Sequence, residues 1–258
     1  MKVQLLPSTI DDCGKASARQ HLMSIIIDDR VAIDAGSLAF SCSELQRSDV
    51  RDIVLTHTHL DHIAGLPLFI DDLFASLTAP IRIHATREMI ETLERDIFNW
   101  QVYPRFSELT NEHGPVIKYV EFEPGSRFDV QHLSVASVLV NHNVSANGYI
   151  ISDGAVSVGI TGDTAETDEI WTKMNSKSDL RALLIECAFP NELDELAQVS
   201  HHLTPRRLGR ELEKFRNSDC ELHIINMKPM YRESIIKEIG ELGIERLKIF
   251  EVGKVYEW

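Results

Sequence analysis

The sequence predicts an α/β fold in which two β-sheets pack face to face and helices cover them on the outside, a four-layer αββα sandwich. Three observations lead to this fold class. Short apolar runs end in turn residues, amphipathic helical segments separate several of these runs, and the same pattern recurs in the second half of the chain. No low-complexity tract or Pro/Gly-rich linker interrupts residues 1–258, so a single domain is expected.

Strands are expected where short runs rich in apolar residues stop at turn-forming residues. The predicted strands are residues 24–28, 31–34, 53–56, 81–84, 149–152, 156–161, 182–186 and 222–226. Helices are expected where apolar residues recur every three or four positions. The predicted helices are residues 63–77, 88–100, 205–215 and 234–242. Thr204, directly before Pro205, is well suited to cap the third of these helices.

The composition indicates a protein that folds without disulfide bonds. Hydrophobic residues make up 43% of the chain, enough for a substantial core. The four cysteines (Cys13, Cys42, Cys187 and Cys220) form no C-x-x-C pair, which predicts reduced, mostly buried thiols. The apolar runs are far shorter than the roughly 20 residues of a membrane span. The first residues lack the features of a secretory signal, so with Met1 as the start a cytoplasmic protein is expected.

The net charge of −14 limits the partners that this protein can bind. An acidic surface repels phosphate backbones, which are normally bound by clusters of Lys and Arg. Large nucleic acids are therefore not expected as substrates. A small anionic substrate remains compatible, because metal ions in a cleft can invert the local field. Neither of the glycine-rich nucleotide-binding fingerprints is present.

One segment carries most of the chemistry. The predicted strand 53–56 is followed by His57, His59, Asp61 and His62 within six residues, just before a predicted helix. Side chains alternate along an extended chain, so His57 and His59 should point the same way and reach one ion. Asp61 and His62 would then reach a second ion nearby. Imidazole and carboxylate ligands suit Zn²⁺, and also Mn²⁺ or Fe²⁺.

Three further motifs follow in the chain. Asp34-Ala35-Gly36 is an early aspartate–glycine turn, His142 lies in an N-H-N segment, and Asp163 lies in T-G-D-T after an apolar run. Together with the histidine motif, they resemble the metallo-β-lactamase superfamily along most of the chain. The resemblance implies that His142 is the third histidine of the first metal site and that Asp163 bridges two metal ions. A carboxylate has two oxygens and can hold two cations about 3.5–4 Å apart.

A narrower resemblance concerns two later segments. Asp96-Ile97-Phe98-Asn99-Trp100 with Tyr103-Pro104-Arg105-Phe106 is similar to part of the class II cyclic-nucleotide phosphodiesterases. So is Glu186-Cys187-Ala188-Phe189-Pro190-Asn191 with Ser200-His201-His202-Leu203-Thr204-Pro205. In that family the histidine of the H-L-[ST]-P element lies beside the metals, which implies this place for His202. His201 is expected to support the site or to be exposed. An aromatic core and a helix cap are the alternative, purely structural explanations.

The chain departs from this family at Asn226. The resemblance leads us to expect a histidine there, before Lys228-Pro229, as a ligand of the second metal. An amide oxygen binds zinc less well than imidazole does. His223, three residues earlier, should face the other side of the sheet and is a poor substitute. The presence of a second metal is therefore open.

These motifs predict metal-assisted hydrolysis of a small phosphodiester, a 3′,5′-cyclic nucleotide such as cAMP or cGMP. Water activated by the metal would attack phosphorus, and Asp61 would orient it or bind the second ion. His202 would act as a general acid or stabilise developing charge. Other hydrolases of the same fold remain alternatives: a tRNA 3′-end-processing endonuclease, a lactonase or a thioesterase. A non-catalytic metal- or ligand-binding module is a further one. A homodimer is expected only by analogy with the superfamily.

Overall fold

The computed structural model describes residues 1–258 as two compact units, each built on a seven-stranded mixed sheet. The first unit contains residues Met1–Ala18, Leu22–Glu123 and Val252–Glu257. The second unit contains Arg19–His21, Pro124–Glu251 and Trp258. Two mixed sheets with flanking helices confirm the predicted α/β class, while a single domain over the whole chain stays a prediction.

The sheet of the first unit has the strand order β16-β1-β2-β3-β4-β5-β8. Its strands are β1 (Lys2–Leu5), β2 (Ile25–Ile27), β3 (Val31–Ile33), β4 (Asp52–Val54), β5 (Ile81–Ala85), β8 (Ile117–Glu121) and β16 (Val255–Glu257). Neighbours from β16 to β3 pair antiparallel, and neighbours from β3 to β8 pair parallel. A separate hairpin joins β6 (Thr110–Asn111) to β7 (Gly114–Pro115). The buried strand β4 delivers the histidine motif at its carboxyl end.

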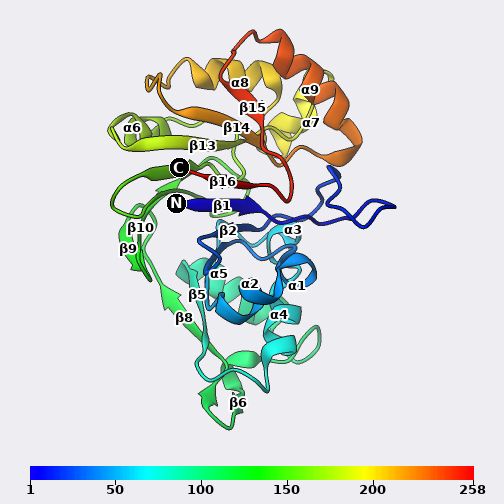
Figure 1. The fold of residues 1–258 in the computed structure, drawn as a ribbon, viewed down its shortest axis with the longest axis vertical. Coiled ribbons are helices and arrows are strands. Elements are labelled where there is room, and N and C mark those ends of the chain that lie inside the picture. The colour runs from blue at the N-terminus through cyan, green and yellow to red at the C-terminus, as the bar shows by residue number, and fades with distance from the viewer. The chain divides into compact units, whose positions relative to one another are not determined.

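Helices cover one face of this sheet. They are α1 (Leu38–Ser41), α2 (Glu44–Asp49), α3 (Leu60–Ile63), α4 (Leu66–Leu73) and α5 (Arg87–Thr92). Leu38, Phe69 and Met89 from three of them share a core cluster with Ile53 and Ile83 of the sheet. In Figure 1 these helices, in blue and cyan, lie beside the strands of their own sheet. Of the predicted helix 63–77, residues 66–73 form α4, while residue 63 is the last residue of α3. The predicted helix 88–100 is formed by α5 and the π-helical turn Leu93–Ile97 that follows it.

The sheet of the second unit has the order β15-β14-β13-β12-β11-β10-β9. Its strands are β9 (Arg127–Val130), β10 (Leu133–Leu139), β11 (Asn147–Ser152), β12 (Ser157–Ile160), β13 (Leu180–Glu186), β14 (Glu221–Ile225) and β15 (Leu247–Ile249). Strands β12 to β15 pair parallel, whereas β11 is antiparallel to both β10 and β12. Strands β10, β12, β13 and β14 therefore run in the same direction, and their carboxyl ends meet at one edge of the sheet.

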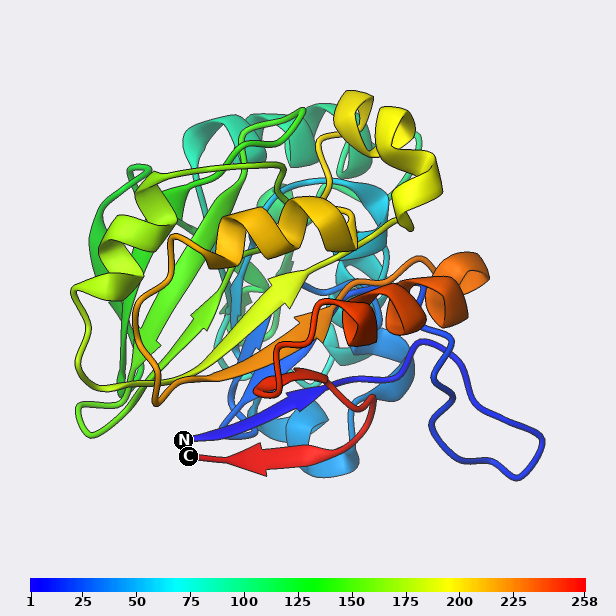
Figure 2. The same ribbon diagram turned by 90° about the horizontal axis from the view of Figure 1, so that it is seen from above.

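Three helices pack on one face of the second sheet. The helices of this unit are α6 (Glu169–Asn175), α7 (Asp194–Val199), α8 (Pro205–Leu212) and α9 (Arg232–Glu241). Trp171 of α6, Leu208 of α8 and Ile235 of α9 share a core cluster with Leu183 and Ile224 of the strands. Figure 2 shows these three helices running over the strands of that sheet. The predicted cap of α8 is confirmed, since Thr204 accepts a hydrogen bond from the backbone N–H of Arg207.

The cysteines are free thiols, as predicted, but only two of the four are buried. Cys187 and Cys220 are buried, Cys42 is partly exposed and Cys13 is exposed. Burial raises the pKa of the Cys220 thiol to about 12, which favours the protonated thiol at neutral pH. A helix with the length and apolar character needed to cross a membrane is not found in the chain.

Candidate metal centre

In the first unit the structure brings three imidazole rings together after β4. The ring centroids of His57 and His62 are 4.1 Å apart, and those of His57 and His59 are 4.7 Å apart. His57 and His62 are fully buried, whereas His59 is partly exposed. Asp61 and His62 lie in the short helix α3, where the sequence predicted a turn into a helix. We call residues 57–62 the histidine loop.

Asp34 orients the histidine loop through its carboxylate. Its Oδ1 accepts the backbone N–H of Thr56, its Oδ2 accepts the Thr56 hydroxyl, and Oδ2 lies 2.7 Å from Nδ1 of His62. The Thr56 hydroxyl also lies 3.0 Å from Nδ1 of His57. Because both rings engage these partners through Nδ1, Nε2 is the nitrogen that each would offer to a cation. Asp34 thus supports the histidine loop.

Gly36, two residues after Asp34, permits the close approach of the histidine loop. A Cβ atom at this position would lie 2.0 Å from the carbonyl oxygen of Asp61 and 2.7 Å from the backbone nitrogen of Met23. The same carbonyl accepts a hydrogen bond from Met23 N–H at 2.8 Å. Any larger residue would have to displace backbone, so the glycine of the D-A-G turn has a steric cause.

In the second unit the candidate residues gather at the carboxyl edge of the sheet. His142 follows β10, Asp163 follows β12, Glu186 ends β13 and Asn226 follows β14. His202 reaches the same place from the segment before α8. His142, Asp163 and His202 each offer a ligand atom, and these atoms lie within 4.8 Å of one another. Two imidazoles and a carboxylate at this spacing fit a divalent cation.

His202 is held by a buried carboxylate that the sequence analysis did not assign. Its Nδ1 lies 2.9 Å from Oε1 of Glu186, which is fully buried, and 4.0 Å from Oδ2 of Asp163. Burial disfavours the protonated ring, but the charge of Glu186 and its hydrogen bond outweigh burial and raise the pKa of His202. A signal in the sequence was the glutamate that follows four apolar residues at the end of β13. This pair can hold a proton beside the cluster.

His142 is oriented by its neighbour in space, His201. The Nδ1 of His142 lies 3.0 Å from the backbone carbonyl of His201, so its Nε2 is turned toward a cation. The His142 and His202 ring centroids are 5.1 Å apart. His201 has a φ of +54°, a left-handed conformation that is uncommon for histidine. Its supporting contact agrees with the expectation that it does not itself carry the chemistry.

Asn226 contacts the predicted bridging residue. Its Nδ2 donates a hydrogen bond of 2.6 Å to Oδ1 of Asp163. The amide nitrogen of Asn226 is therefore the atom that faces Asp163. The assignment of Asn226 as a metal ligand stays a prediction. His223 packs against Phe250 at a centroid distance of 5.3 Å and lies 3.0 Å from Oε2 of Glu221. His223 therefore has a structural role in the sheet, as expected from its position.

We predict that Asn226→His raises the zinc content of the protein towards two ions per chain. The new imidazole would replace a hydrogen-bond donor with a strong ligand beside Asp163, which is predicted to stay a ligand. Zinc stoichiometry and affinity are measured by elemental analysis and chelator competition. Asn226→Ala is the control, because it removes the hydrogen bond to Asp163 without adding a ligand. Two equally tight zinc ions in the wild type, unchanged in Asn226→His, would show that the departure has no effect.

The aromatic residues of the segment 96–106 contribute to the core of the first unit, and the segment borders an apolar pocket. Phe98 and Phe106 are buried, with ring centroids 5.7 Å apart, so the structural explanation holds for these two residues. Three other residues of this segment, Ile97, Val102 and Tyr103, help to line a pocket of about 250 Å³. It is lined by Leu60, Ile63, Ala64, Pro67, Leu68, Ile97, Val102 and Tyr103. Leu60 belongs to the histidine loop, so the pocket adjoins candidate metal ligands.

Comparisons with known proteins agree with this geometry. Residues 29–223 match the model of the beta-lactamase superfamily domain. A probable 3′,5′-cyclic-nucleotide phosphodiesterase of Yersinia pestis is 24% identical over 234 residues, which cover 77% of this chain and 66% of that protein. The chain thus spans about two thirds of the length of this relative.

Two solved structures share the fold over nearly the whole chain. The metallo-β-lactamase fold protein YhfI from Bacillus subtilis has a TM-score of 0.73 and 19% identity, covering 100% of this chain and 99% of its own. Unliganded yeast PDE1 has a TM-score of 0.77 and 15% identity, covering 98% of each chain. The chain therefore belongs to the metallo-β-lactamase superfamily, as a metal-dependent hydrolase with histidine and aspartate ligand clusters.

Proposed function

We propose that the protein hydrolyses a small phosphodiester, a 3′,5′-cyclic nucleotide, to the nucleoside monophosphate. The observation that carries this proposal is the buried His202–Glu186 pair beside Asp163 and His142. Cleavage of a phosphodiester releases an alkoxide that needs a proton, and this pair holds one next to a cluster that fits a cation. The name and sequence similarity of the Yersinia pestis relative support the cyclic nucleotide as substrate.

We further propose that the histidine loop and the His142–Asp163 pair each supply ligands to a divalent metal ion. Family membership and the donor chemistry of both sets support this assignment. Zinc is the metal proposed, with Mn²⁺ or Fe²⁺ as alternatives. A divalent cation bound there would lower the pKa of water towards neutrality and neutralise charge on the phosphoryl oxygens. His202 would give its proton to the leaving oxygen, and Asp61 would orient the attacking water or bind a second ion.

The apolar pocket suits the rest of such a substrate. Its eight lining residues carry no charge, so a flat nucleobase could pack there while the phosphate stays near the metal ligands. The net charge of −14 disfavours a long RNA, whose backbone needs many basic contacts. The substrate proposed is therefore small and anionic.

A substrate comparison tests this proposal. Metal-loaded protein should turn over cAMP or cGMP faster than it cleaves a structured tRNA precursor at physiological salt, because its net charge of −14 disfavours binding of a phosphate backbone. The same assay includes a lactone and a thioester as matched alternatives. Release of nucleoside monophosphate is measured by chromatography. Faster removal of a tRNA 3′ trailer, or preferred hydrolysis of the lactone or thioester, would refute the cyclic-nucleotide proposal.

Asn226 favours one rival, a non-catalytic metal-binding module. In that case the protein would bind metal and hydrolyse none of these compounds, and turnover would appear only in Asn226→His. Metal analysis of the same samples distinguishes this outcome from a preparation that has lost its metal.

A further inference from the structure

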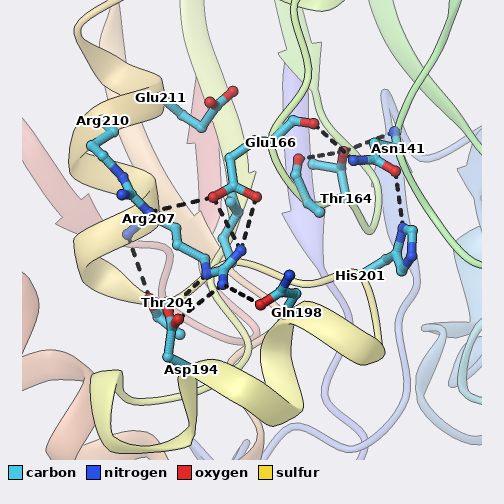
Figure 3. Close-up of polar contacts among 12 residues, drawn as sticks. Asn141, Thr164, Glu166, Asp194, Gln198, His201, Thr204, Arg207, Arg210 and Glu211 are labelled. Carbon is cyan, nitrogen blue, oxygen red and sulfur yellow. Dashed lines mark hydrogen bonds and ion pairs between the residues drawn. The ribbon is translucent and has the colours of Figure 1, made fainter.

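Arg207, on α8, joins three segments of the second unit although it touches none of the candidate ligands. Its side chain is 10% exposed. Its Nε and Nη2 lie 2.7 and 2.9 Å from the two carboxylate oxygens of Asp194, at the start of α7. Its Nη1 lies 3.1 Å from both carboxylate oxygens of Glu166, in the loop after Asp163. Figure 3 shows the guanidinium between these two carboxylates, with Gln198 beside it.

Glu166 in turn belongs to a loop that is bonded to the segment carrying His142. Its carbonyl oxygen accepts a hydrogen bond of 2.9 Å from Nδ2 of Asn141. The Asn141 backbone N–H donates to the Thr164 hydroxyl at 3.1 Å, and its carbonyl accepts from Ala165 N–H at 2.7 Å. These hydrogen bonds fix the segment 163–166 to the segment 141–142, so Asp163 and His142 are held together.

The same asparagine reaches the segment before α8. Its Oδ1 lies 2.9 Å from Nδ1 of His201, and the His201 carbonyl contacts Nδ1 of His142. Figure 3 shows Asn141 contacting both Thr164 and His201. The backbone N–H of the next residue, His202, donates a hydrogen bond to the carbonyl oxygen of Ala197 in α7. Arg207 contacts the same helix through Asp194. The loops of His142, Asp163 and His202 thus meet in one polar network that ends on Arg207.

We propose that Arg207 is a positioning residue that holds His142, Asp163 and His202 in the arrangement needed for the metal and the reaction. The proposal deepens the proposed function and rests on it for the reaction, but not for metal binding. A planar guanidinium fixes the direction of both carboxylates, whereas a lysine ammonium is a point charge that fixes only distance. Without the guanidinium, Asp194 and Glu166 would be left as like charges that repel, and their segments would separate.

The experiment compares Arg207→Met and Arg207→Lys with a control variant on the same helix, Arg210→Met. Arg210 is 60% exposed and contacts Glu166 once, at 3.5 Å. Zinc affinity is measured by chelator competition and ligand geometry by the absorption spectrum of the Co²⁺-loaded protein. kcat and KM are measured with bis(p-nitrophenyl) phosphate, and folding by thermal denaturation.

Arg207→Met should bind zinc about 10- to 100-fold more weakly, the range seen when groups that orient metal ligands are removed. Its Co²⁺ spectrum should change, and kcat should fall by roughly 10-fold or more while KM changes little. Arg207→Lys should recover part of the loss, and Arg210→Met should match the wild type. A lower melting temperature with unchanged zinc affinity, Co²⁺ spectrum and kcat would reduce Arg207 to a stabilising ion pair and overturn the proposal.

A second pair of variants covers the case in which Arg207→Met does not fold. Asp194→Asn and Glu166→Gln each weaken one side of the network and keep the guanidinium in place. Weaker zinc binding in either variant supports the proposal, and wild-type zinc affinity in both refutes it. Since zinc affinity needs no substrate, a failure of the phosphodiester proposal alone would leave these results intact.

Discussion

His59→Ala is expected to lower the metal content of the protein by well over ~10-fold, the lower end of the range seen for residues that only orient ligands. The reason is geometric, since the rings of His57, His59 and His62 lie together at the end of β4. His59 is the partly exposed member of the three, so its removal should disturb the hydrophobic core little. Any hydrolysis should fall together with the metal content.

Elemental analysis of the purified protein measures this effect directly. His113→Ala is the control, because His113 is an exposed histidine that contacts Glu112 and belongs to no cluster of candidate ligands. Its metal content should equal that of the wild type. If His59→Ala retained full metal, the histidine loop would not be a metal site and the central assignment would fail.

The histidine loop could be predicted because its information is local. A buried strand, four ligand-type residues within six positions and a following helix are all read from neighbouring residues. The site residues at the carboxyl edge of the second sheet could be predicted only through the family resemblance, because His142, Asp163 and Asn226 are far apart in the chain. Parallel pairing of the strands that precede Asp163 and Asn226 explains why these two residues meet.

The roles of Glu186 and Arg207 could not be predicted from the sequence. Glu186 acts through His202, 16 residues away, and Arg207 acts through Glu166, 41 residues away. Neither pairing is indicated by periodicity or by a motif, because both contacts arise only when separate loops fold against each other. Contacts of this kind become visible only in the structure.

Helix boundaries were missed for a different reason. The apolar periodicity of residues 63–77 continues through Gly65, whereas in the structure α3 ends before this glycine and α4 begins after it. Periodicity shows which face of a helix is buried, but it does not show where the helical hydrogen bonds stop. Helices α6 and α7 have seven and six residues, too short for a clear period. Strand β16 pairs with β1 from the opposite end of the chain, a contact that no local pattern predicts.

His202→Ala is expected to lower kcat on a good phosphodiester substrate by roughly 100-fold or more while metal content stays near that of the wild type. The ring lies at the edge of the His142–Asp163 cluster and is bound through Nδ1 to the buried Glu186. This arrangement suits proton donation better than it suits tight metal binding, because the carboxylate favours the protonated form of the ring. Glu186→Gln should therefore reduce kcat in the same direction, since it removes the charge that stabilises the protonated ring.

The control for this prediction is His223→Ala, another buried histidine, which packs against Phe250 in the same unit. It should cost stability but leave the kcat of the folded protein close to that of the wild type. Steady-state kinetics and elemental analysis are run on the same preparations. A kcat for His202→Ala within about threefold of the wild type would exclude His202 from the chemistry. Loss of the metal in His202→Ala would instead make this residue a ligand, and the general acid would have to be sought elsewhere.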